Sequence, residues 1–179
     1  MIEISAETIE RVEALLAGVP KGAERALSNA MNRGLSKMKT GAAKKVREVY
    51  TVQSSAINEA TNTRIQKAST GNLAGYIHFS GYKIPLYKFK VTPKAPGVKK
   101  QVTAAVKKGG GTAFENAFIA QMKSGHIGVF ERETSKRFPI EEKMGLAMAQ
   151  MVGNTNVMTE LEKEAQKTVT ELFEAKKIE

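Results

Sequence analysis

The sequence predicts an α+β fold in which a long N-terminal helix packs on an antiparallel sheet, with helices at both termini. Apolar residues recur at three- and four-residue steps between residues 21 and 49, as they do on one face of a helix. The spacing then changes to a period of two, which is typical of strands with one buried face. We therefore expect a single domain over residues 1–179, with a helical part at 1–50, a sheet at 63–132 and C-terminal helices at 141–177.

The helical part begins with a short helix that Ser5 or Thr8 can cap. Its apolar face consists of Ile9, Val12, Leu15 and Leu16. Pro20 suits the first turn of a second helix, expected from Lys21 to Val49 and roughly 40 Å long at about 1.5 Å per residue. The apolar stripe of this helix is rich in alanine and glycine. Such small residues let another backbone approach closely, so we expect the stripe to lie across a sheet.

A short helix at Ser54–Ala60 leads into the sheet. Strands are expected at Arg64–Ala68 and Leu73–Ser80, paired around a turn at residues 69–72. In the second strand Leu73, Gly75, Ile77 and Phe79 share one side, and Tyr76 and His78 share the other. His78 is therefore expected on the less buried face rather than as a ligand.

The next part of the sheet contains a kink and a loop. Pro85 cannot donate to a β-ladder, so residues 84–86 are expected at a sheet edge. Val98–Val106 alternates between apolar and polar residues and predicts a strand. Lys107–Thr112 is basic and rich in glycine, and we expect it to be a flexible loop outside the fold that makes an assembly contact.

The segment from Ala113 to Asn154 contains the clearest local pattern. Two apolar pieces, Ala117–Met122 and Ile127–Phe130, flank a polar turn with Gly125, which predicts a β-hairpin. A basic arm at Arg132–Arg137 follows it, and Phe138 is kept extended by the proline after it. The spacing then predicts a short helix over Glu141–Val152. A last helix begins at Thr155 or Asn156, with a stripe of Val157, Leu161, Ala165, Thr168 or Val169, and Leu172 or Phe173.

The composition argues against an enzyme. The chain has no cysteine and no aspartate, and both histidines, His78 and His126, are isolated in the sequence. Nucleophilic dyads, thiolate metal sites and most phosphoryl-transfer sites are therefore not expected, nor is any cofactor. The chain has no run of about 18 apolar residues, so we expect no membrane span. Three glutamates among the first ten residues do not fit a signal peptide.

Positive charge is concentrated in the middle of the chain. Residues 21–110 contain 18 lysines and arginines against three glutamates, whereas the whole chain has a net charge of +10. We expect this segment to face DNA or an acidic protein partner, through Lys88, Lys90, Lys94, Lys99, Lys107 and Lys108. A second candidate patch on the long helix consists of Arg33, Lys37 and Lys44. Candidate assembly loops contain Gly109, Gly110, Gly111, Arg132, Lys136 and Arg137.

Several segments in a fixed order resemble one family. They are IPLYKFKVTPKAPGV from Ile84, the glycine run at 109–111, AFIAQMKSGHIGVFER from Ala117, RFPIEEKMG from Arg137 and QMVGN from Gln150. Together they resemble the minor tail protein Z family of tailed bacteriophages and prophages, whose members are also described as tail completion proteins. The resemblance covers residues 26–154.

The resemblance implies a structural virion protein that completes the head-proximal end of a tail and helps to join tail and head. It also implies a ring, sixfold to match the tail tube, and contact with tail tube, tail terminator or head–tail connector proteins. The location implied is the virion neck, with assembly in the host cytoplasm. The charge pattern leaves one alternative open, which is a non-specific nucleic-acid-binding protein. Few aromatic residues interleave with the charges, which favours the structural role.

Overall fold

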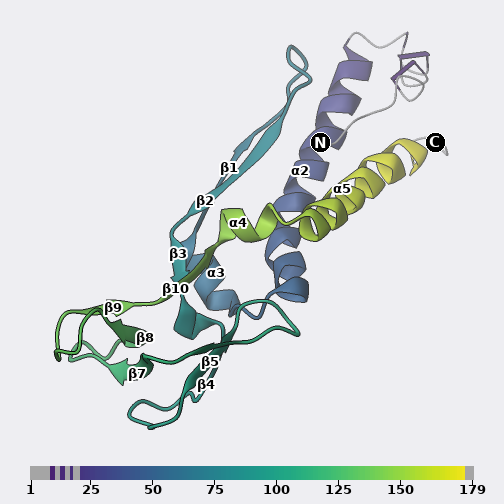
Figure 1. Ribbon diagram of the computed structural model, residues 1–179. Helices are drawn as coiled ribbons and strands as arrows, with labels where there is room; N and C mark the ends of the chain where they lie inside the picture. The colour runs from purple at the N-terminus through teal and green to yellow at the C-terminus, as the bar shows by residue number, and fades with distance from the viewer. Residues whose placement is uncertain (1–8, 11–12, 15–16, 18–20, 176–179) are drawn as a thin grey trace. The chain divides into compact units, whose positions relative to one another are not determined.

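The computed structural model describes residues 9–10, 13–14, 17 and 21–175 (Figure 1). Most of the predicted first helix, including Ser5, Thr8, Val12, Leu15 and Leu16, lies outside the described residues. The chain divides into two compact units. The helical unit comprises Met1–Lys45, Thr63–Phe79 and Asn154–Glu179, and the sheet unit comprises Val46–Asn62 and Ser80–Gly153. The single domain expected from the sequence stays a prediction.

Two long helices form the framework of the helical unit. They are α2, Gly22–Val49, and α5, Thr155–Ala175, which run side by side in Figure 1. Both helices were predicted from the spacing of their apolar residues, and the residues at that spacing are the ones that are buried. The buried side chains are Leu27, Ala30, Leu35, Met38 and Ala42 of α2, and Val157, Leu161, Ala165 and Val169 of α5.

The small residues of α2 explain how closely the two helices approach. A Cβ added at Gly41 would lie 3.4 Å from Leu161 Cδ2 and 3.2 Å from Glu164 Oε2. The predicted close approach is therefore confirmed here, but the partner at Gly41 is a helix. The stripe also meets the segment that precedes the strand at Tyr76–Gly81, since Leu35 Cδ1 would lie 2.8 Å from a Cβ at Gly75. One stripe thus packs against α5 and against this segment.

A hairpin of β1, Thr61–Gln66, and β2, Tyr76–Gly81, accompanies the helices. Both strands are confirmed, but β1 begins at Thr61 and ends at Gln66 instead of covering Arg64–Ala68, and β2 begins at Tyr76 instead of Leu73. The early end of β1 reflects a contact of Asn32: its Nδ2 donates to the Ala68 carbonyl at 2.9 Å, and its Oδ1 accepts from the Ala68 amide at 2.9 Å. Because α2 takes both polar backbone groups of Ala68, this residue cannot continue the ladder. The alternation in β2 is confirmed, with Tyr76 and His78 exposed.

The sheet unit contains three small antiparallel sheets and two short helices. Sheet one pairs β3, Lys83–Pro85, with β10, Met144–Ala147. Sheet two is β4, Lys90–Thr92, β5, Val102–Ala105, and β6, Thr112–Phe114. Sheet three is β7, Ala117–Gln121, β8, Ile127–Arg132, and β9, Ile140–Glu142. The helices are α3, Ser54–Ala60, and α4, Met148–Val152, and a 3₁₀ turn, η1, covers Leu86–Lys88.

Local signals predicted part of this unit correctly. The β7–β8 hairpin is confirmed, with Phe118 opposite Phe130 and Gly125 at a φ of 85° in the turn. Helix α3 has the predicted bounds. Pro85 lies in a strand with one neighbour, as the missing amide requires. The core that these elements enclose includes Ile84, Val102, Val129, Met148, Met151 and Val152.

The predicted helix over Glu141–Val152 is wrong for its first seven residues. Residues 140–142 form β9 and residues 144–147 form β10, so the helix begins only at Met148. Between the two strands, Lys143 donates its amide to the Val129 carbonyl at 2.8 Å and accepts from the Leu86 amide at 2.9 Å. Helical bonds cannot form while partners distant in sequence occupy these groups. Gly145 also lets Phe89 approach, since an added Cβ would lie 2.4 Å from Phe89 Cε2.

The predicted strand Val98–Val106 is also shorter than expected. Only Val102–Ala105 form β5, and Val98 to Gln101 are exposed. Both neighbours of β5 are three-residue strands, so no ladder partner extends to residue 98. The strand β6 was not predicted.

The expectation that Lys107–Thr112 lies outside the fold is wrong. Lys107 forms an antiparallel bridge with Tyr50, and the Lys108 amide donates to Val49 at 2.9 Å. Gly110 donates to the Lys107 carbonyl, and Gly109 has a φ of 78°. The glycines therefore form the tight turn of the β5–β6 hairpin, where a left-handed residue is needed.

Candidate interaction surfaces

One face of the β4–β5–β6 sheet carries Lys90 together with threonine side chains. Lys90 lies opposite Ala105, and Thr92 lies opposite Thr103, so these side chains share one face. Lys90, Thr92 and Thr103 are exposed on it. The other face buries Val91, Val102 and Ala104. The pleat thus separates a basic, threonine-bearing outer face from an apolar inner face.

The Thr51 side chain joins β4 to β5 next to Lys90 and Lys107. Its hydroxyl donates to the Ala105 carbonyl and accepts from the Lys90 amide at 3.0 Å. Lys107 follows β5 by two residues, and its Nζ lies 6.0 Å from the centroid of the Tyr50 ring. Tyr50 itself is buried. The backbone beside Lys90 and Lys107 is therefore anchored, while both ammonium groups remain on exposed residues.

The other predicted lysines surround the sheet. Lys94 and Lys99 are exposed in the connection between β4 and β5, Lys108 is exposed in the glycine turn, and Lys88 is half-buried in η1. The prediction omitted Lys100, which is exposed next to Lys99 in the connection between β4 and β5. The chain contains no carboxylate from Lys83 to Phe114. Within the described part of the chain, none of these lysines forms an ion pair. We call this group, with Thr92 and Thr103, the basic face.

Four carboxylates of the sheet unit, Glu131, Glu133, Glu141 and Glu142, lie in or next to the third sheet. Glu131 pairs with Lys143, and this hydrogen bond, with Coulombic attraction from Glu131 and Glu141, raises the pKa of Lys143 against the opposing effect of desolvation. His126 Nε2 lies 2.8 Å from Glu142 Oε1, and its ring meets the Phe130 ring edge-on at 6.4 Å. The Glu131–Lys143 pair places opposite charges together, whereas the lysines of the basic face have no carboxylate near them in the sequence.

The basic arm at residues 132–137 makes two contacts at its base. The Arg132 guanidinium lies 4.9 Å from the Phe118 ring centroid and donates to the Arg137 carbonyl, which closes the loop at its base. Arg137 in turn lies 5.6 Å from the ring centroid of Phe138. The Phe138 side chain is 63% exposed, an apolar surface that the pattern of residues did not reveal.

The second predicted patch, on α2, is divided between two grooves. Arg33 lines a groove of about 460 Å³ together with Asn29, Ser36 and Lys67. Lys37 and Lys44 line another of about 430 Å³, whose lining also contains Glu164, Lys167 and Glu171. The α5 carboxylates offset the charge in the second groove. Arg33, Lys37 and Lys44 therefore do not form one uniformly basic surface.

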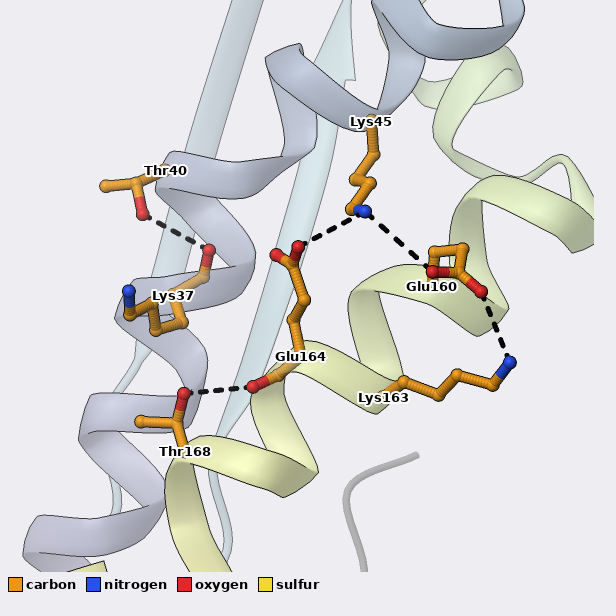
Figure 2. Close-up of polar contacts among 7 residues, drawn as sticks. All are labelled: Lys37, Thr40, Lys45, Glu160, Lys163, Glu164 and Thr168. Atoms are coloured by element: carbon orange, nitrogen blue, oxygen red, sulfur yellow. Dashed lines mark hydrogen bonds and ion pairs between the residues drawn. The ribbon is translucent and has the colours of Figure 1, made fainter. Parts of the chain in front are cut away.

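A polar cluster links α2 to α5 beside these grooves (Figure 2). Lys45 Nζ lies 3.2 Å from Glu164 Oε1 and 3.8 Å from Glu160 Oε2, and its side chain is only 13% exposed. Lys163 reaches Glu160 from the solvent side at 3.2 Å. Thr168 donates to the Glu164 carbonyl at 2.9 Å. Lys45 thus places a positive charge at the contact between α2 and α5, which we call the α2–α5 seam, where two α5 carboxylates pair with it.

Replacing Lys45 with alanine is expected to lower the free energy of unfolding by about 1–2 kcal/mol, between the values for exposed and buried ion pairs. The loss arises because two carboxylates would face each other at the seam without their shared cation. The matched control is Lys163→Ala, since that side chain is 69% exposed and should contribute less than about 0.5 kcal/mol. Urea unfolding of both variants measures the difference, and equal midpoints would contradict the role given to Lys45.

Among the described residues, no group of three or more histidine or acidic side chains is placed to hold a metal ion. In the same part of the chain, no helix is long and apolar enough to cross a membrane.

Comparison with known families gives one match. The family described as Prophage minor tail protein Z (GPZ) matches residues 7–176. No curated protein and no solved structure matches the chain significantly. The family match extends beyond the resemblance read from residues 26–154 and includes both units.

Proposed function

Because the chain belongs to the prophage minor tail protein Z family, we propose that it completes the head-proximal end of a phage tail as one subunit of a ring. The family makes it a structural component of the tail. In the proposed ring, six copies match the tail tube and help to join the tail to the head. Its neighbours are tail tube, tail terminator or head–tail connector proteins, met during assembly in the host cytoplasm.

The observation that supports this proposal is the basic face. Its seven lysines, from Lys88 to Lys108, have no carboxylate among them in the sequence, and the sheet pleat turns Lys90 outward with Thr92 and Thr103. A surface of this kind attracts a polyanion, because positive charges without local partners sum into one field. We assign it to the lumen of the ring, where it faces DNA passing the neck or an acidic neighbouring ring.

A ring would multiply the effect of the basic face. Each lysine is repeated by symmetry, so contacts that are weak in one copy add up around the lumen. Contacts between exposed charges are screened within about 10 Å at 0.1 M salt, so their contribution should fall as salt increases. The threonine hydroxyls of the same face can donate hydrogen bonds to phosphate or carboxylate oxygens.

The test is charge reversal at two positions of the basic face, Lys99→Glu together with Lys107→Glu. We expect particle assembly or DNA retention to fall, and the loss to depend on salt, because attraction becomes repulsion at every copy. The matched control is Lys39→Glu with Lys123→Glu, which changes the charge equally at exposed residues outside the basic face. Thermal unfolding of both double variants excludes a loss of folding as the cause.

The outcomes separate the candidate functions. If the double variant assembles and retains DNA normally at two salt concentrations, the basic face is only a solvated surface and its assignment to the lumen is wrong. If the isolated protein shifts in size-exclusion chromatography only when DNA is added, and never joins tails, the alternative of a non-specific nucleic-acid-binding protein is supported. Light scattering with and without DNA measures this directly.

A further inference from the structure

The helical unit contains an open apolar groove between α2, β2 and α5. It measures about 510 Å³ and is lined mainly by Met31, Leu35, Met38, Ile77, Phe79 and Met158. Leu35 and Met38 are buried at its base, whereas Ile77, Phe79 and Met158 are half-buried and remain in contact with water. Partly exposed apolar side chains gathered in one depression are typical of a surface that another group covers.

The chemistry of the groove fits an aromatic side chain next to a positive charge. Three of its lining residues are methionines, which are unbranched and polarizable and adapt to an inserted ring. Glu162 adds a carboxylate to the lining. An aromatic ring bordered by lysine or arginine would therefore find both an apolar site and an opposite charge.

The sheet unit of the same chain presents a group of this kind. Phe138 is 63% exposed between β8 and β9, and Lys136 and Arg137 precede it in the sequence. The Arg132 contacts with Phe118 and with the Arg137 carbonyl hold the base of this loop. A restrained loop loses less conformational entropy when it binds than a free one. Phe138 is thus an apolar group presented in an ordered basic setting.

We infer that Phe138 of one copy inserts into the groove between α2, β2 and α5 of a second copy. The contact joins different surfaces of the two copies, so it is heterologous and can repeat from copy to copy until a ring closes. This inference rests on the ring proposed above and names the contact that forms it. The proposed occupant of the groove is a second copy of this chain, whose Arg137 faces Glu162 of the copy that carries the groove.

Cysteine cross-linking tests the contact, because the natural chain has no cysteine. We expect Phe138→Cys and Met158→Cys variants, mixed and oxidised with diamide, to form a disulfide-linked heterodimer. Tyr82→Cys, mixed with Met158→Cys in the same way, is the matched control, since Tyr82 is 85% exposed and lies outside the loop and the groove. A yield no higher than that of the control would overturn the inference.

A chain with both Phe138→Cys and Met158→Cys distinguishes contact between copies from contact within one chain. The inference predicts a ladder of linked oligomers on a non-reducing gel. An oxidised monomer alone would show that the loop reaches its own groove, and unlinked protein would show that another partner covers the groove. Either result overturns the inference.

A second measurement separates this contact from the ring itself. Light scattering over a range of concentrations should show that Phe138→Ala weakens self-association by about thirtyfold or more, as expected for a buried aromatic anchor. Tyr82→Ala should associate like the natural chain. If rings form equally well with Phe138→Ala, the contact is wrong and the ring stands. If the natural chain does not associate and the cysteine variants do not cross-link, both the contact and the ring are wrong.

Discussion

Replacing Gly81 with alanine is expected to lower the free energy of unfolding by about 3–5 kcal/mol, a loss in the range of severe single substitutions. Gly81 has a φ of 150°, which L side chains rarely adopt. An added Cβ would lie 2.0 Å from the Ala60 carbonyl oxygen and 3.2 Å from Thr61 Cα. Because both obstacles are backbone atoms, no side chain can move aside to relieve the clash.

The backbone shift that would relieve the clash also has a cost. The Ala60 carbonyl accepts a hydrogen bond from the Tyr82 amide at 3.2 Å, and moving either partner weakens it. Gly71→Ala is the matched control, since a Cβ there meets no heavy atom within 4 Å and its change should stay within about 0.5 kcal/mol. Urea unfolding compares the two, and equal midpoints would refute the close approach at residues 60 and 81.

Leu161→Ala is expected to lower the free energy of unfolding by about 2–5 kcal/mol, as other buried leucine truncations do. The Leu161 side chain is 0% exposed and contacts α2 where Gly41 brings the two helices together. The substitution removes apolar contacts and leaves a cavity that two rigid helices cannot easily close. Amide hydrogen exchange should show the loss of protection first in α2 and α5.

Leu73→Ala is the control for this prediction. Leu73 is 39% exposed, so the same chemical change removes little buried surface and should cost less than about 1 kcal/mol. Thermal unfolding followed by circular dichroism measures both variants. Comparable losses for Leu161→Ala and Leu73→Ala would show that the α2–α5 seam is not a principal source of stability.

The elements that could be predicted from the sequence are those whose signals are local. Helices α2 and α5 carry their own apolar stripes, and the turn at Gly125 defines the β7–β8 hairpin. The wrong assignments occur where partners distant in sequence decide the conformation. Residues 141–147 have helical spacing, but pairing with β8 and β3 makes them strands. Pairing between distant segments overrides local preference when it satisfies more backbone hydrogen bonds.

The candidate surfaces likewise have some features that the sequence predicts and others that depend on the fold. The candidate lysines and their lack of nearby carboxylates were visible from composition, and so was the absence of cysteine and aspartate. The placement of Lys90 and Lys107 beside Thr51 depended on the pairing of β4 with β5. The exposure of Phe138 and the groove lined by Met31 and Met158 carry no signal in the spacing of residues.

The sequence by itself determined the helices with apolar stripes, the hairpin, the charge distribution and the family, because each of these depends on residue type and short-range order. Only the tertiary structure decided which strands pair, where β1 ends at the Asn32 contact, and which apolar side chains remain exposed. The physical reason is that burial and strand pairing belong to groups brought together from distant parts of the chain. A sequence pattern indicates which local conformation a residue favours, whereas the tertiary fold determines which distant residues it contacts.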